Sequence, residues 1–125
     1  MEKMNVEQFV NHYIEAWSTQ NTQLRNKLVK QVYSEQAEFY ADEPGDKAVA
    51  YCGLDEIYTN ISQVNERLVV GNGLITESKD FSENHETVRI RWQMKKPDGE
   101  IALEGMNLLL LNENGKIEKD YIFIN

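Results

Sequence analysis

The chain has 125 residues, 41% hydrophobic and 27% charged, so it is long and apolar enough to fold as one domain, 1–125, without a disulfide or a metal. Asp and Glu number 21 against 13 Lys and Arg, and the net charge of −8 argues against nucleic acid or a membrane as a partner. No segment has the length of a membrane span, and Cys52 is the only cysteine, so we expect a cytoplasmic protein.

The first predicted element is an amphipathic helix at 6–18. Phe9, Tyr13 and Trp17 recur at four-residue spacing, which places them on one face of a helix. Asn5 directly precedes this stripe, and its side chain can cap the first turn. We therefore expect this helix to cover the core with its aromatic face.

A second helix is predicted after the polar turn at 18–21. Its apolar residues repeat at the same four-residue spacing, at Leu24, Leu28 and Val32. The basic residues between them are expected on the solvent side, and they are Arg25, Lys27 and Lys30.

A short strand and a third helix follow. The strand is predicted at 37–41, and it ends in an acidic loop that contains Pro44 and Gly45. The third helix begins at 53–56, because acidic residues in a first turn interact favourably with the helix dipole. Its buried face is formed by Ile57, Ile61 and Val64.

From Leu68 onward the hydrophobic period changes to two, which is typical of strands. The predicted strands span 68–79, 87–96, 100–111 and 117–124. Turn residues rather than helices join them, so we expect an antiparallel sheet. Helices followed by a strand meander indicate an α+β domain, with N-terminal helices packed on a curved antiparallel sheet.

The hairpin at 97–100 predicts how the strands on either side of it are paired. A two-residue turn centred on Asp98 and Gly99 places Trp92 opposite Gly105, where the glycine leaves room for the indole. The same register places Asn107 in the middle of an apolar face, and a buried amide needs partners. Asn107 therefore either satisfies a structural partner or contacts a ligand.

The last hairpin has two possible registers. A four-residue loop at 112–115 places Asp120 opposite Asn107 and turns Ile122 and Ile124 inward. A three-residue loop at 113–115, with Gly115 in the left-handed conformation, turns Asp120 to solvent. The sequence leaves both registers open.

Four segments together resemble the nuclear transport factor 2-like superfamily, also called SnoaL-like. They lie on the first helix, at the entry to the first strand, at the start of the third helix and in the last hairpin, at 12–17, 33–39, 53–57 and 110–117. The resemblance covers essentially the full chain. It implies a cone-shaped α+β fold with an internal pocket between the helices and the sheet.

Two groups within that superfamily offer residue-level comparisons. Tyr13 stands where the ketosteroid isomerases carry the tyrosine of their oxyanion hole, and Asn107 stands where they carry a protonated aspartic acid. Their catalytic aspartate precedes a proline, and alignment on Pro44 brings Asp42 or Glu43 near that position. SnoaL-type cyclases use acid/base residues on the last strand, where this chain has Asp120.

We therefore expect an enzyme or a binding module for a small lipophilic molecule. The enzyme would be a cofactor-independent isomerase, cyclase or dehydratase, in which Tyr13 and Asn107 polarise a carbonyl while Asp42, Glu43 or Asp120 moves a proton. The alternative is a non-catalytic ligand-binding or dimeric scaffold module. The residues expected to line the pocket are Trp17, Phe39, Tyr58, Ile90, Trp92 and Leu103.

Two further expectations concern metals and assembly. His12 and His85 are too few and too far apart in the sequence to indicate a metal site. The last two strands are apolar on both alternating faces, at 108–111 and 121–124. One face is covered by the helices, so we expect the other to form a homodimer interface, which the resemblance also implies.

Overall fold

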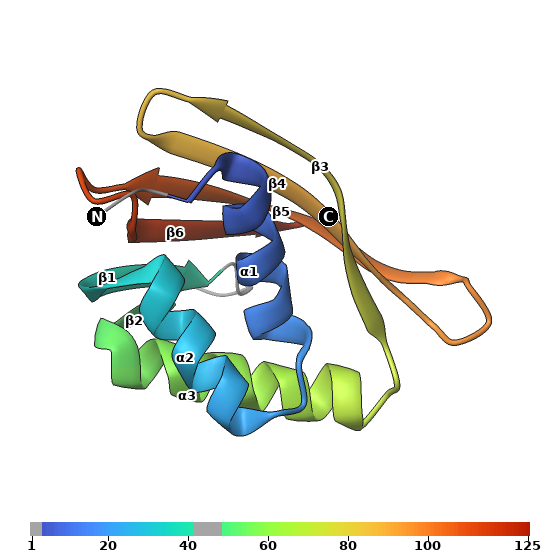
Figure 1. Cartoon of the computed structure of the whole chain (residues 1–125). Helices are drawn as coiled ribbons and strands as arrows, with labels where there is room; N and C mark the ends of the chain where they lie inside the picture. Colours follow the sequence, from blue (N-terminus) through green and yellow to red (C-terminus); the bar gives the residue numbers. More distant parts are fainter. Residues whose placement is uncertain (1–3, 42–48) are drawn as a thin grey trace.

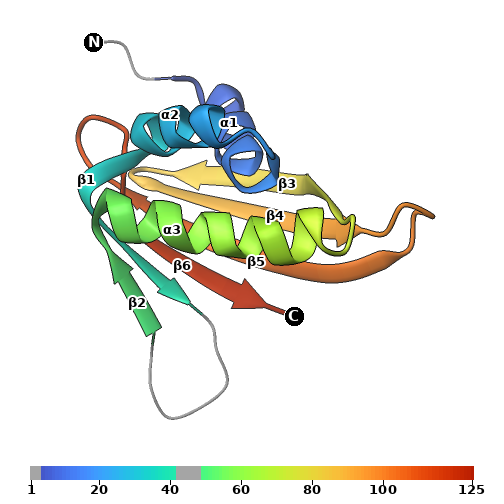
Figure 2. The same ribbon diagram turned by 90° about the horizontal axis from the view of Figure 1, so that it is seen from below.

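The computed structural model describes residues 4–41 and 49–125 and has an α+β architecture (Figure 1). Its helices are α1 (Val6–Ser18), α2 (Thr22–Val32) and α3 (Gly53–Asn65), and a π-helical turn, η1 (Glu66–Val70), continues α3. Its strands are β1 (Tyr33–Ala41), β2 (Val49–Cys52), β3 (Ile75–Asn84), β4 (Thr87–Lys95), β5 (Ile101–Leu111) and β6 (Ile117–Ile124). Figure 2 shows the helices together on one face of a curved sheet.

The six strands form one sheet in the order β2-β1-β6-β5-β4-β3. The predicted antiparallel pairing is confirmed for β3 to β6, and β1 pairs antiparallel with β2. It is wrong for β1 and β6, which run parallel, so the sheet is mixed. These two strands are far apart in the sequence, and no hairpin fixes their relative direction.

The α1 prediction is confirmed at both ends, and the Asn5 side chain accepts a hydrogen bond from the Gln8 backbone N–H at 2.8 Å.

The expectation that Arg25 faces solvent is wrong, because its side chain is buried. Its guanidinium donates to the Thr19 carbonyl oxygen and to Ser62 Oγ. The carbonyls at the end of α1 carry partial negative charge, so they can hold a buried cation.

The predicted strand at 68–79 is wrong in its first half. Leu68 and Val69 belong to η1, and the strand begins only at Ile75. The two side chains pack with Leu74 against Trp92 and Met94, so their apolar character reflects a small second core rather than a strand.

The predicted pairing of β4 with β5 is confirmed, with Trp92 opposite Gly105. The turn that produces it differs from the prediction. The Gly99 N–H donates to the Lys96 carbonyl oxygen and the Lys96 N–H donates to the Glu100 carbonyl oxygen, so Pro97, Asp98 and Gly99 form a three-residue loop. A bulge between Met94 and Lys95 then restores the predicted register.

The last hairpin has the loop of one alternative and the side-chain facing of the other. The Asn112 N–H donates to the Lys116 carbonyl oxygen and Gly115 has a φ of 79°, so the loop is the three-residue one. A bulge between Leu110 and Leu111 then shifts the pairing by one residue. As a result Asp120 lies opposite Leu109 and faces inward, as the four-residue loop would have required.

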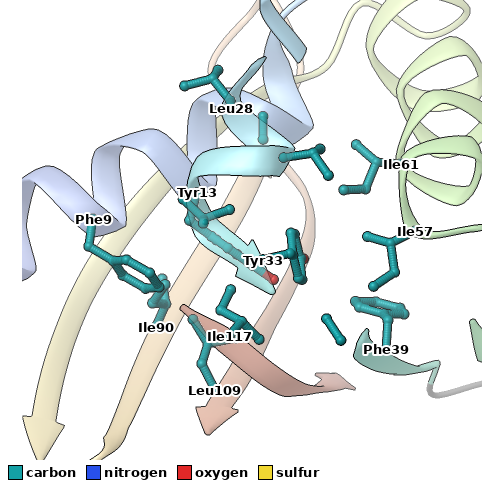
Figure 3. Packing of buried hydrophobic residues seen from close by; sticks show 14 of the residues in the cluster. Phe9, Tyr13, Leu28, Tyr33, Phe39, Ile57, Ile61, Ile90, Leu109 and Ile117 are labelled. Atoms are coloured by element: carbon teal, nitrogen blue, oxygen red, sulfur yellow. The ribbon is translucent and has the colours of Figure 1, made fainter. Parts of the chain in front are cut away.

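The core lies between the helices and the concave face of the sheet (Figure 3). Ile57 and Ile61 enter it from α3, and Ile90, Leu109 and Ile117 enter it from the strands. Tyr13 from α1 and Tyr33 from β1 lie in its centre with their ring centroids 6.2 Å apart. Two phenol hydroxyls in an apolar core need polar partners.

Candidate functional site

Asp120 is the partner of both buried tyrosines. Its side chain is fully buried, and its Oδ2 accepts hydrogen bonds from the hydroxyls of Tyr13 and Tyr33, each at 2.7 Å. Its Oδ1 accepts a third hydrogen bond from Asn107 Nδ2 at 2.6 Å. The carboxylate therefore joins α1, β1, β5 and β6 at one point beneath the helices.

Asn107 extends this network to Trp92. The indole Nε1 of Trp92 donates to Asn107 Oδ1 at 2.7 Å, and both side chains are buried. Gly105 makes this position of the indole possible, because a Cβ there would lie 2.4 Å from Trp92 Cζ2. One N–H of the Asn107 amide is left over after these two bonds, since a primary amide has two.

Burial controls the protonation of the network. It raises the pKa of Asp120 from its ordinary value of 3.8 to about 6, while the hydrogen bonds from Asn107, Tyr33 and Tyr13 pull the pKa down. The pKa values of Tyr13 and Tyr33 are raised well above 10, first by burial and then by the nearby Asp120 charge. Near neutral pH the phenols are therefore neutral donors, and Asp120 can exchange a proton.

A cavity of about 190 Å³ lies beside the network, between α1, α3, η1 and the sheet. For comparison, a dry cavity of about 150 Å³ can hold benzene. The walls are mostly apolar, and Tyr13 and Asn107 line the end next to Asp120. Asp120 and Tyr33 lie behind that wall, so a ligand would meet the carboxylate through Tyr13 or Asn107.

The cavity brings together most of the residues that the sequence placed at the site. Besides Tyr13 and Asn107, the walls include Trp17, Phe39, Trp92 and Leu103. Tyr58 instead donates to the Thr22 carbonyl oxygen on α2, and Ile90 packs in the core. Asp42 and Glu43 lie outside the described residues.

Sequence reasoning missed Tyr33, the second phenol on Asp120. It directly follows the last residue of α2 and begins β1, so neither a helical nor a strand period identifies its facing. The only available signal was a large aromatic residue at the junction of two elements. In the sheet Tyr33 is opposite Ile117, and its hydroxyl reaches Asp120 only because β1 pairs with β6, which joins distant parts of the chain.

Two polar atoms in the cavity walls have no hydrogen-bond partner among the described residues. They are Trp17 Nε1 and Thr76 Oγ1, and both are buried. Trp17 Nε1 lies near the Tyr33 hydroxyl without making a regular hydrogen bond to it, and its N–H slightly lowers the pKa of that phenol. Most buried polar groups are paired, so these two atoms indicate positions where a bound molecule could be held.

In the described parts of the chain, no group of three or more His, Cys, Asp or Glu side chains could hold a metal ion. None of the helices in those parts is both long enough and apolar enough to cross a membrane.

No family model and no curated protein matches the sequence. Solved structures do match. A candidate isomerase of the SnoaL-like family from Agrobacterium tumefaciens superposes with a TM-score of 0.79 at 20% identity, over 95% of this chain and 96% of that one. The chain has the nuclear transport factor 2-like fold. The resemblance inferred from sequence is thereby confirmed at the level of the fold.

Two further structures support the same assignment. An NTF2-like protein of unknown function from an Exiguobacterium species has a TM-score of 0.68 at 18% identity, over 94% of this chain and 98% of that one. A candidate polyketide cyclase from Sinorhizobium meliloti has a TM-score of 0.66 at 14% identity, over 98% and 100%. At these identities the likeness concerns the NTF2-like fold and not an activity.

Proposed function

We propose that this NTF2-like chain binds a small lipophilic carbonyl compound in the cavity and catalyses an acid/base reaction of the isomerase, cyclase or dehydratase kind. The observation that carries the proposal is the hydrogen bond between Tyr13 and the buried Asp120 at the polar end of an apolar cavity. Cavities of this kind bind small molecules through apolar walls and a few placed polar groups. The candidate isomerase and cyclase among the structural neighbours are consistent with such chemistry.

The proposed chemistry is one concerted step in which two protons move. When Asp120 is protonated its hydrogen bond with Tyr13 reverses, so the carboxyl donates to the Tyr13 oxygen and the Tyr13 proton turns to the ligand. Asp120 then gives its proton to Tyr13 while Tyr13 gives its own to the ligand carbonyl oxygen, and the carbonyl becomes an enol. The spare N–H of Asn107 stabilises the charge that develops on the same oxygen. The raised pKa of Tyr13 disfavours a free phenolate, so the two transfers are concerted. The proton on carbon goes to Asp42 or Glu43, which alignment on Pro44 brings near the place of the catalytic aspartate of the ketosteroid isomerases.

Turnover of lipophilic ketones and enones, selected first by thermal shift, tests the proposal. Tyr13→Phe should lower kcat by about 100-fold or more, which is the usual contribution of a positioned acid. The kcat of the wild type should fall as the pH rises through about 6, because the pKa of Asp120 lies there and only its protonated form donates.

Tyr33→Phe is the matched control, since it removes the other phenol from the same carboxylate oxygen. Turnover should remain, and the pH at which it falls should rise, because the Tyr33 hydrogen bond lowers the pKa of Asp120. If Tyr13→Phe leaves turnover unchanged, the role given to Tyr13 is wrong.

The second candidate function is non-catalytic ligand binding. The observation in its favour is that the hydroxyls of Tyr13 and Tyr33 and the amide of Asn107 already hydrogen-bond to Asp120, so the network can be explained by structure alone. In that situation ligands stabilise the protein without being converted, and Tyr13→Phe changes stability only.

The proposed assembly is a homodimer through the outer face of the sheet. Leu108 and Tyr121 are opposite each other on that face, as are Met106 and Phe123, and Phe123 is 48% exposed. The helices lie on the other face (Figure 2). A second copy would cover this apolar surface with one self-complementary interface.

Light scattering at micromolar concentration measures the assembly directly. We expect about twice the 14.5 kDa mass of one chain. Leu108→Lys should return the mass to that of one chain, because it places a charge in the buried interface. The same substitution at exposed Ala102, beyond the apolar patch, is the control and should leave the dimer intact. A wild-type mass of one chain would contradict the dimer.

A further inference from the structure

The cavity has a second polar end that the proposed chemistry does not use. Thr76 lies opposite Met94 on the inner face of the β3 and β4 pair, and its buried Oγ1 has no partner among the described residues. Arg67, on η1, is a solvent-exposed residue that borders the same cavity, and no hydrogen bond or ion pair of its guanidinium is found within residues 4–41 and 49–125.

The strand register places this end far from Asn107. Asn107 is opposite Ile90, whereas Thr76 is opposite Met94, four residues further along β4, which corresponds to about 13 Å. Thr76 is also two strands away from Asn107, which adds about 10 Å across the sheet. A molecule that contacts both ends must therefore be elongated.

Arg67 and Thr76 belong to the same end of the cavity. Leu68 and Val69, directly after Arg67, pack against the small cluster that contains Met94, and Met94 is the neighbour of Thr76 on β4. Figure 1 shows how the end of α3 and η1 leads directly into β3. Thr76 and the solvent-exposed Arg67 thus border the same mostly apolar cavity.

We propose that the ligand carries a carboxylate at the end formed by Thr76 and Arg67, in addition to the carbonyl at Tyr13 and Asn107. A guanidinium matches the planar shape of a carboxylate, and such charge-assisted hydrogen bonds are among the stronger ones in proteins. The Thr76 hydroxyl donates a further hydrogen bond to the same group. The chain as a whole has a charge of −8, so an anion is attracted here by Arg67 itself and not by the overall field.

This inference rests on the proposed function, because it assumes that a carbonyl compound occupies the cavity. It narrows the ligand class to elongated lipophilic keto acids. The apolar stretch between the two polar groups packs against the walls, where Trp17, Leu68 and Met94 lie. The two ends together fix the orientation of the bound ligand in the cavity.

Calorimetric titration with three related probes tests the inference. They are para-acetylphenylbutanoic acid, its methyl ester and para-butylacetophenone, which share the ketone and differ at the far end. We expect the wild type to bind the acid at least about tenfold more tightly than the other two, the effect of one good charge-assisted hydrogen bond. Arg67→Gln should abolish this preference and leave the affinity for para-butylacetophenone unchanged.

Two further variants distinguish the carboxylate site at Thr76 and Arg67 from a nonspecific effect of charge. Arg91→Gln removes the same charge from the outer face, where Arg91 pairs with Asp80, and should keep the preference for the acid. Thr76→Val should weaken binding of the acid and raise the melting temperature of the ligand-free protein, because it replaces an unpaired buried hydroxyl by a methyl group.

The outcomes distinguish this inference from the proposed function. Equal binding of the acid and the two neutral ketones by the wild type would overturn the carboxylate site and leave the proposed function intact. An equal loss of affinity for the acid in Arg67→Gln and Arg91→Gln would overturn it as well, since it would indicate a long-range charge effect. If none of the three probes binds, the proposed function fails and this inference fails with it.

Discussion

The stability of Asp120→Asn relative to the wild type should increase as the pH rises from about 4 to about 7. The difference between their free energies of unfolding should change by about 3 kcal/mol in total. Burial raises the pKa of folded Asp120 to about 6, above its ordinary value of 3.8. The folded protein therefore holds this proton more tightly than the unfolded chain. The resulting stability is fully present below the unfolded pKa and is lost as the pH rises through the folded one.

Urea unfolding of both proteins across this pH range measures the difference. Tyr33→Phe is the matched control, because it removes one of the hydrogen bonds that lower the pKa of Asp120. In that variant the loss of stability should extend to higher pH than in the wild type. A difference between wild type and Asp120→Asn that stays constant with pH would mean that Asp120 titrates alike in the folded and unfolded states.

Gly105→Ala should destabilise the protein by about 3 kcal/mol, at the upper end of what overpacking usually costs. A Cβ at this position would lie 2.4 Å from Trp92 Cζ2 and 2.9 Å from the Phe123 carbonyl oxygen. The indole has to move, and its hydrogen bond to Asn107 is lost with it. Because Asn107 also holds Asp120, the variant should bind ligands more weakly as well.

Gly99→Ala separates this clash from the general effect of replacing a glycine. Gly99 has a φ of 93° and no atom within 4 Å of an added Cβ, so only backbone strain of about 1 kcal/mol is expected. Urea unfolding and tryptophan fluorescence together measure stability and the position of the indole. Equal losses of stability in Gly105→Ala and Gly99→Ala would mean that the Trp92 indole moves aside without destabilising the protein.

The two bulges explain why the register was only partly predictable. Alternating apolar residues on β4 and β5 identify which side chains face inward, and this is enough to pair Trp92 with Gly105 although the turn was assigned incorrectly. On β6 the residues are apolar on both faces, so alternation gives no answer. The bulge after Leu110 decides that Asp120 faces inward, and a bulge depends on how the whole sheet curves.

Local residue patterns are sufficient to predict the elements whose cause is local. The α1 helix follows from its four-residue stripe and the Asn5 cap. The inward facing of Tyr13 follows from helical periodicity, and that of Asn107 follows from strand pairing. What these residues contact depends on how distant segments pack together. Tyr33 and Asp120 meet because β1 and β6 pair in parallel across most of the chain, and Arg25 is buried because α1 ends beside it. Contacts between distant segments depend on the packing of all the elements together, which no local pattern of residues records.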